Sequence, residues 1–295
     1  MNNAKDTIIS QCLSLANTAL ESSWTLHNST EALFWFRSVL KVDPQNAMAR
    51  LGSARVYQYI ASQPWWHNDV SLARSAASKA LAILKEPIRP HNVAESREQA
   101  LVCGQIYSAI GQSNLAERYL SEGITIDPLY SSGHYFLHFN NIFIDPRGDR
   151  ILSGLNEAVE LAKVEGNQRR LAAALYFRGF ANTVFSNYDE AIKDLKRSMA
   201  NNPGYGSANL ALIAAAALAR HKATYKAVRC FKERHPNFRP DVLDYMWVDR
   251  SSSAEYHRLT RPILKILKVK LGSEWLGKAG SRLTGALPHF GGKVS

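Results

Sequence analysis

Residues 104–128 read GQIYSAIGQSNLAERYLSEGITIDP, and residues 179–203 read GFANTVFSNYDEAIKDLKRSMANNP. Both stretches begin with Gly and end 24 residues later with Pro, which follows an Asp or an Asn. Small and bulky side chains recur in step between these ends, and the matching pairs are Ala116 and Ala191, Leu120 and Leu195, and Gly123 and Ser198. The two stretches are therefore copies of one structural unit.

The residue types of this unit predict a pair of antiparallel helices. Small side chains are needed where two helices cross closely, and a bulky one such as Leu120 fills the groove to the next pair. Proline cannot continue a helix, so Pro128 and Pro203 mark where the second helix ends. The pattern resembles the 34-residue tetratricopeptide repeat. One pair cannot bury its apolar face alone, so several pairs must stack into a solenoid.

Weaker copies extend the pattern along the chain. Pro44 ends a first unit, a second unit carries a long loop between its helices, and a loosely spaced sixth unit ends at Pro236. No alternating strand pattern competes with this interpretation. We expect an all-α, right-handed superhelical solenoid of five or six helix pairs over residues 1–238, a helical extension over 239–271 and a flexible basic tail over 272–295.

Positions of the first helices that face the inside of such a solenoid define a candidate partner-binding groove. They hold Arg55, Tyr59, Leu101, Gln105, Tyr135, Phe139, Ile142, Phe143, Tyr176 and Phe180. The groove is apolar and aromatic around the fourth and fifth units, which favours a hydrophobic helix or an extended peptide as the guest. The alternative is that the chain's own C-terminal helix fills it. The first unit has Asn17 and Glu21 where other repeat proteins carry a carboxylate clamp, so that clamp is not expected there.

Two aromatic residues and two histidines interrupt the repeat pattern. Trp65 and Trp66 lie on the long loop of the second unit, where they could anchor a ligand or plug the gap between the first two units. His134 and His138 stand four residues apart, as a metal pair on a helix would. Without a third ligand in the sequence, we expect both histidines to pack against the second helix of their own unit.

Charge is distributed unevenly along the chain. The formal net charge is +11 for 295 residues, and residues 218–295 carry 16 basic against 6 acidic side chains. A basic surface follows an apolar stripe near the C-terminus and consists of Arg258, Arg261, Lys265, Lys268 and Lys270. It could meet an acidic protein, an anionic membrane or nucleic acid by electrostatics, or it could be a solvated helix face. Motifs that read bases are absent, so we do not expect specific nucleic-acid binding.

The remaining sequence features narrow the class of protein. No stretch approaches the about 18 apolar residues of a membrane span, and no secretory signal is evident. Three widely spaced cysteines indicate a reducing compartment, so we expect a cytoplasmic protein. Serine-nucleophile motifs, phosphate loops and the HExxH zinc motif are also absent. We therefore expect neither an enzyme nor a bound cofactor or metal.

Residues 1 to about 258 resemble the repeat region of bacterial class III adenylate cyclases and related winged-helix regulators. The resemblance rests on Trp65-Trp66 with Asp69 and Leu72, and on the closing segment from His235 to Arg239. It implies a bacterial regulatory scaffold or adaptor that binds another protein. No cyclase or winged-helix segment precedes Ala4, so we expect neither of those activities. A regulator that acts through its basic C-terminal end is the alternative.

Overall fold

A computed structural model describes residues 2–22, 25–249 and 251–272. Within these ranges the regular secondary structure is helical, without strands. The helices are α1 (Asn2–Ser22), α2 (Leu26–Val42), α3 (Ala47–Ser62), the 3-10 turn η1 (Pro64–Trp66), α4 (Val70–Lys85), α5 (Val93–Ala109), α6 (Ser113–Ile126), α7 (Ser131–Ile144), α8 (Gly148–Val164), α9 (Gln168–Val184), α10 (Tyr188–Asn201), α11 (Gly206–Leu218), α12 (Ala223–Arg234), α13 (Val242–Trp247) and α14 (Ala254–Leu271).

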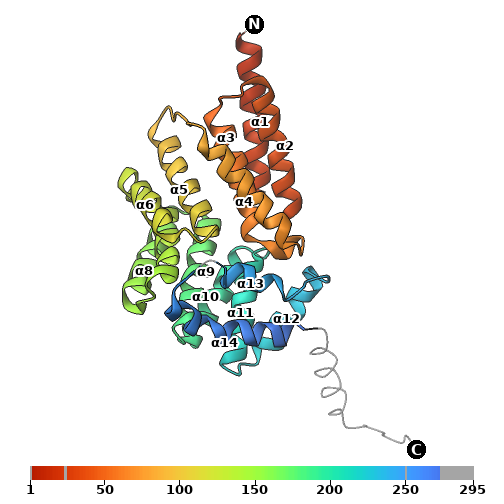
Figure 1. The fold of residues 1–295 in the computed structure, drawn as a ribbon, viewed down its shortest axis with the longest axis vertical. Helices are drawn as coiled ribbons and strands as arrows, with labels where there is room; N and C mark the ends of the chain where they lie inside the picture. Colours follow the sequence, from red (N-terminus) through yellow and green to blue (C-terminus); the bar gives the residue numbers. More distant parts are fainter. Residues whose placement is uncertain (1, 23–24, 250, 273–295) are drawn as a thin grey trace, which may run out of the picture.

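Helices α1 to α12 form six consecutive antiparallel pairs that stack in chain order (Figure 1). The pairs are α1 with α2, α3 with α4, α5 with α6, α7 with α8, α9 with α10 and α11 with α12. This arrangement confirms the predicted all-α, right-handed solenoid of tetratricopeptide type. The sixth unit, whose spacing is irregular in sequence, forms a complete pair like the others.

Gly104 and Gly179 occupy the same position in their two units, and each lies where the two helices of its pair cross. A Cβ atom added to Gly104 would lie 2.5 Å from Cγ of Leu120, and one added to Gly179 would lie 2.7 Å from Cγ of Leu195. Both distances are well below van der Waals contact, so glycine is what lets α5 approach α6 and α9 approach α10. The same Gly and Leu spacing in the two units therefore reflects the same geometry of helix crossing in both.

Two large apolar cores divide the solenoid. One joins α1 to α5, and the other joins helices from α7 to α14. The Ala-rich helix α11 lies inside the second core, where its residues from Gly206 to Ala216 are buried. Trp65 also belongs to this second core, although it follows α3 in the chain.

The long loop of the second unit joins the two halves of the molecule. The side chain of Asn68 donates to the carbonyl of Asn237 at 2.8 Å and accepts from the backbone N–H of Arg239 at 3.0 Å. Arg74 of α4 pairs with Asp249 at 3.2 Å. The expectation that this loop plugs the gap between the first two units is wrong, because the loop packs against the C-terminal helices.

An arginine makes a second contact between units that are far apart in the chain. Arg169, at the start of α9, donates from Nη2 to the carbonyl of Leu20 in α1 at 2.6 Å. The first and fifth units therefore touch across the inside of the superhelix.

The C-terminal extension consists of α13 and α14, which lie against the lower half of the solenoid (Figure 1). The hydroxyl of Ser253 caps α14 by accepting from the backbone N–H of Tyr256 at 3.3 Å. Pro262 lies inside α14, which nevertheless runs as one continuous helix from Ala254 to Leu271. Of the predicted flexible tail, residues 273–295 lie outside the described residues. None of the described helices combines the length and the apolar character that a bilayer crossing requires.

Candidate ligand cavity on the inner face

The first helices of the second to fifth units, α3, α5, α7 and α9, surround a cavity of about 350 Å³ on the inner face of the solenoid. Trp247 of α13 and Trp65 of η1 also line it. Seven of the ten predicted groove residues line the cavity, and they are Arg55, Tyr59, Leu101, Gln105, Tyr135, Phe139 and Tyr176.

The other three predicted groove residues are buried outside the cavity, two of them against the C-terminal extension. The ring of Phe143 packs 5.0 Å from that of Tyr256 in α14, and the ring of Phe180 packs 5.9 Å from that of Trp247 in α13. Ile142 is fully buried in the same core. These residues are wrong as open groove positions, because the extension occupies that part of the inner face. The extension thus fills one part of the groove and leaves the cavity in the other.

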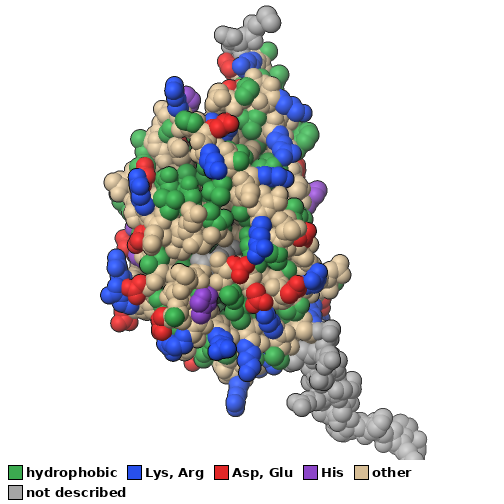
Figure 2. Space-filling model, in the orientation of Figure 1, with side chains coloured by type: hydrophobic (Ala, Val, Ile, Leu, Met, Phe, Trp, Pro, Cys, Tyr) green, Lys and Arg blue, Asp and Glu red, His purple; other side chains and the backbone are tan. Residues whose placement is uncertain are grey.

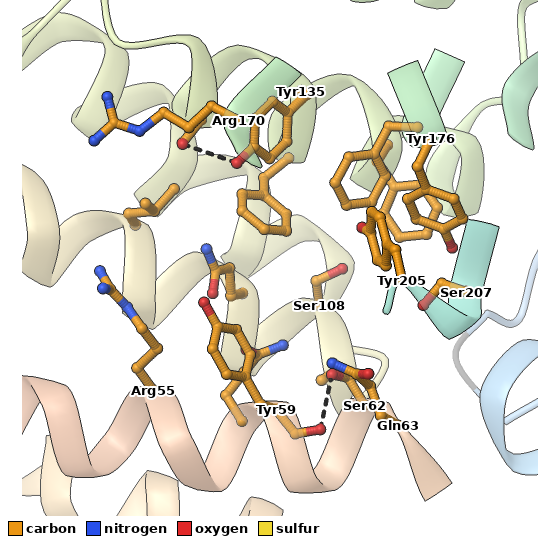
Figure 3. Close-up of a pocket in the computed structure, with 18 of the residues that line it drawn as sticks. Arg55, Tyr59, Ser62, Gln63, Ser108, Tyr135, Arg170, Tyr176, Tyr205 and Ser207 are labelled. Atoms are coloured by element: carbon orange, nitrogen blue, oxygen red, sulfur yellow. Dashed lines mark hydrogen bonds between the residues drawn. The ribbon is translucent and has the colours of Figure 1, made fainter. Parts of the chain in front are cut away.

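One end of the cavity is cationic. Figure 3 shows Arg55 and Arg170 projecting from opposite walls at the same end. Arg55 forms an ion pair with Glu98 of α5. Arg170 donates from Nη1 to Glu165 at 3.0 Å, and its guanidinium lies 4.4 Å from the ring centre of Tyr130. The carboxylates of Glu98 and Glu165 do not line the cavity.

Tyrosine side chains dominate the rest of the cavity. The rings of Tyr176 and Tyr205 pack 4.8 Å apart, at the end of the view in Figure 3 that is opposite to the arginines. The hydroxyl of Tyr135 lies 2.9 Å from that of Ser132. Burial raises the pKa of Tyr135 and the pKa of Tyr205 above the usual value for a phenol. These side chains are therefore neutral hydrogen-bonding groups at physiological pH.

Three buried polar atoms around the cavity have no hydrogen-bond partner among the described residues. They are Oε1 of Gln58, Oε1 of Gln105 and Nε1 of Trp65. The side chains are 7%, 5% and 2% exposed, so bulk water does not serve them. A buried polar group without a partner costs about 1–3 kcal/mol, and a bound molecule could recover this free energy.

Some residues that line the cavity were omitted from the predicted groove although they lie at repeat positions that face it. Gln58 and Ser108 occupy the same inner-face position of the second and third units, between positions that were used. Arg170 and Tyr205 lie at or just before the start of a first helix, outside the repeat positions. No periodicity marks such turn residues, so the sequence held no comparable signal for them.

The two Trp residues and the two histidines have structural contacts. Trp65 is buried, and its indole lies against Gly206, where an added Cβ would be 2.9 Å from Nε1; Trp66 is half-buried against the same core. His138 packs on Gly154 of α8, the second helix of its own unit, as expected. Nε2 of His134 lies 2.7 Å from the carbonyl oxygen of Pro128 in the preceding turn. No group of three potential metal ligands occurs among the described residues.

The predicted basic surface is partly neutralised. Arg258 pairs with Glu255 at 2.6 Å, and Lys268 pairs with Asp244 at 2.7 Å. Arg261 and Lys265 are exposed and Lys270 is half-buried, and Figure 2 shows Lys and Arg side chains near the lower end, where α14 lies. The apolar stripe of α14 is buried in the core through Tyr256, Ile263, Leu267 and Leu271. Insertion of this stripe into a membrane would therefore require α14 to leave the core.

Comparisons with known proteins agree on the fold. No family model matches the sequence. The chain is 25% identical over 170 residues to a DnaJ protein P58IPK homolog of Arabidopsis thaliana, which covers 56% of this chain and 33% of that protein. The chain thus spans about a third of the length of this relative.

Solved structures with low sequence identity share the architecture. A Rap protein complexed with competence and sporulation factor matches with a TM-score of 0.56 and 13% identity, over 97% of this chain and 91% of that one. The Cut9–Hcn1 hetero-tetramer matches with a TM-score of 0.54 and 15% identity, over 81% of this chain and 45% of that one. The human IFIT1 dimer with m7Gppp-AAAA matches with a TM-score of 0.53 and 15% identity, over 88% of this chain and 60% of that one. The resemblance to adenylate cyclases and winged-helix regulators stays a prediction. The chain has the fold of tetratricopeptide repeat proteins.

Proposed function

We propose that this chain is a non-catalytic interaction module that binds an extended peptide segment of a partner protein in the inner-face cavity. The observation that carries the proposal is the combination of an aromatic wall with the unpartnered buried atoms of Gln58, Gln105 and Trp65. Ligand sites typically combine a largely apolar lining with a few placed polar groups.

Of the two guests that the sequence left open, an extended segment suits the cavity better than a helix. A helix pairs its main-chain N–H and C=O groups internally, whereas an extended segment keeps these groups available for the walls of the cavity.

The unpartnered atoms suit a peptide main chain. The carbonyl oxygens of Gln58 and Gln105 accept, and main-chain N–H groups donate. The indole N–H of Trp65 donates, and a main-chain carbonyl accepts. An extended peptide offers donors and acceptors alternately along its length, so it carries both kinds of group that these side chains lack.

The similar structures support this proposal at the level of the fold. The matching Rap structure is a complex with competence and sporulation factor, and the match covers nearly the whole of both chains. We also propose a cytoplasmic protein, since all three cysteines are free, and a bacterial one, on the resemblance to the repeat region of bacterial adenylate cyclases. A contact of the C-terminal end with an acidic surface would be electrostatic and would rely on Arg261 and Lys265.

Affinity selection tests the proposal. The protein is incubated with a synthetic pool of random octapeptides with free termini, and retained peptides are identified by mass spectrometry. The variant Ser108→Trp adds bulk to the cavity wall, and Ser121→Trp adds the same bulk to an exposed site on α6. We expect enriched peptides that bind wild type and Ser121→Trp, and that bind Ser108→Trp at least tenfold more weakly.

A second blocking variant protects the test against misfolding. Ser62→Trp adds bulk from the neighbouring helix α3, and circular dichroism checks that each variant keeps its helix content. Failure to enrich any peptide, or equal binding by folded Ser108→Trp and Ser62→Trp, would overturn the proposal.

A further inference from the structure

We infer that the C-terminal end of the molecule docks on an anionic lipid bilayer through the outer face of α14, by electrostatic attraction and without insertion of the helix. Such a contact goes beyond the proposed function, because no described residue of α14 lines the cavity and a peptide can be held there at the same time. Helices α12 and α14 lie in the lower half of the molecule in Figure 1, and their charges carry the inference.

The C-terminal end has more basic side chains than its own carboxylates neutralise. Every described carboxylate between residues 218 and 272 already forms an ion pair. The exposed basic side chains of the same region that have no carboxylate partner among the described residues are Arg220, Lys222, Lys226, Arg234, Arg261 and Lys265. This end therefore keeps a positive charge that the described part of the chain does not balance, and such a charge attracts an anionic surface.

The outer face of α14 carries basic side chains in one line. Arg258, Arg261, Lys265 and Lys268 are exposed and follow one another at intervals of three, four and three residues. Residues with this spacing are neighbours on one side of a helix. The two outer residues of the line are ion-paired, whereas Arg261 and Lys265 in the middle have no carboxylate partner in the described part of the chain.

The opposite side of α14 is held in the core, so the line of charges has a fixed orientation. Tyr256, Ile263 and Leu267 are each at most 2% exposed. Nζ of Lys232 on α12 also donates to the carbonyl of Gly272, directly after α14, at 3.0 Å. The helix can therefore meet a flat surface along its length while its apolar side stays buried. Basic side chains beside an anionic bilayer bind by electrostatic attraction alone.

The residues around the line favour a lipid surface over nucleic acid. Pro262 and Val269 are exposed and adjoin Arg261 and Lys268 in the sequence, so the face mixes basic and apolar groups as interfacial helices do. Single-stranded nucleic acid is held largely by stacking of its bases on aromatic side chains. The aromatic side chains of the described residues from 218 to 272 are buried or half-buried, so this face offers no stacking platform.

The sequence that follows α14 has the same mixed character. It continues with Trp275, Leu276, Lys278 and Arg282, which lie outside the described residues. Aromatic, aliphatic and basic residues in combination are typical of segments at a bilayer interface. The chain therefore adds both kinds of side chain directly after the proposed contact face.

Vesicle sedimentation of the full chain tests the inference. The probes are vesicles of phosphatidylcholine alone and vesicles that also contain about 30% phosphatidylserine, both at about 0.1 M salt. We expect the protein to bind the anionic vesicles at least about tenfold more tightly than the neutral ones. At about 1 M salt the screening length falls to about 3 Å, so this preference should disappear.

Neutral substitutions assign the binding to α14. Arg261→Gln with Lys265→Gln removes the two unpaired charges of the line, and Lys41→Gln with Lys85→Gln removes the same charge from exposed sites on α2 and α4. A basic residue beside an anionic bilayer contributes about fivefold in affinity, so the first variant should bind about 25-fold more weakly. The control should bind like wild type, and circular dichroism checks that both variants keep their helix content.

Three results would overturn the inference. They are equal binding to neutral and anionic vesicles, wild-type binding by the variant of Arg261 and Lys265, and tighter binding to a DNA duplex or to single-stranded RNA than to anionic vesicles at equal concentration of negative charge. The cavity variant Ser108→Trp should still bind anionic vesicles. Vesicle binding without any enriched octapeptide would therefore contradict the proposed function alone, whereas enriched octapeptides without vesicle binding would contradict this inference alone.

Discussion

A single added methyl group should have opposite effects at two glycines of the same repeat. Gly104 and Gly123 both lie inside helices of the third unit. In each helix, replacing Gly by Ala gains about 0.5–1 kcal/mol, because Ala loses less backbone freedom on folding. The two sites differ in the space that the new Cβ would enter.

The surroundings of the two glycines decide the sign. At Gly104 the new Cβ would lie 2.5 Å from Cγ and 2.7 Å from Cδ2 of Leu120, a side chain that is 1% exposed and cannot move aside. Overpacking of this kind costs about 1–3 kcal/mol and outweighs the gain of about 0.5–1 kcal/mol, so Gly104→Ala should lose stability by up to about 2.5 kcal/mol. At Gly123 the nearest atom is 3.5 Å away, which is ordinary contact, so Gly123→Ala should stabilise by about 0.5–1 kcal/mol.

Urea unfolding followed by circular dichroism measures both effects. Stacked repeats can unfold in more than one step, so the slope of each transition must be compared with that of wild type before free energies are assigned. The double variant Gly104→Ala with Leu120→Ala tests the mechanism, since removal of the Leu side chain removes the clash. Equal or higher stability of Gly104→Ala relative to Gly123→Ala would refute the crossing argument.

Three further predictions follow from burial and from the closure of the solenoid. Burial raises the pKa of the Cys103 thiol to about 12, so Ellman's reagent at pH 8 should modify the half-buried Cys12 and leave Cys103 unmodified until the chain unfolds; equal rates would contradict this. Burial also raises the pKa of Tyr135 and of Tyr205 above the unfolded value of about 10, so folding is favoured while these phenols stay protonated. Stability should therefore fall as the pH rises above about 10, and denaturant midpoints between pH 8 and 11 test this, with a flat profile as the contrary result. Asn68→Gly keeps a residue that tolerates the φ of +53° but removes two hydrogen bonds to the C-terminal half. Amide hydrogen exchange in α13 should therefore become about tenfold faster. Unchanged exchange would show that these hydrogen bonds do not hold the two halves together.

The helix pairs could be predicted from the sequence because each pair is local. Gly104 and Leu120 meet across one turn, so their spacing alone determines that they face each other. The same local rule holds for Gly179 and Leu195 in the fifth unit. Residue types that repeat with this spacing therefore carry the fold, even where no family model matches the sequence.

The closure of the solenoid could not be predicted in this way. Asn68 contacts Asn237 and Arg239, and Arg169 contacts Leu20. These contacts depend on the rotation that accumulates over several units, and small rotations per unit add up along a solenoid. The position of the Trp65 loop depends on the same sum, which is why local reasoning placed it between the wrong units.

The polarity of the cavity also lies beyond the repeat pattern, and this has a consequence for specificity. Repeat positions such as Phe139 and Tyr176 must pack against neighbouring helices, so they supply an aromatic wall. Arg170 and Tyr205 come from the starts of units, where the repeat pattern does not specify the residue type. Tyr205 is also buried in the core, whereas Arg170 is only partly buried, so a substitution of Arg170 can change which ligand is preferred while the stacked pairs stay intact. The fold is therefore encoded in the periodic residues, and the ligand preference depends strongly on residues that the period does not specify.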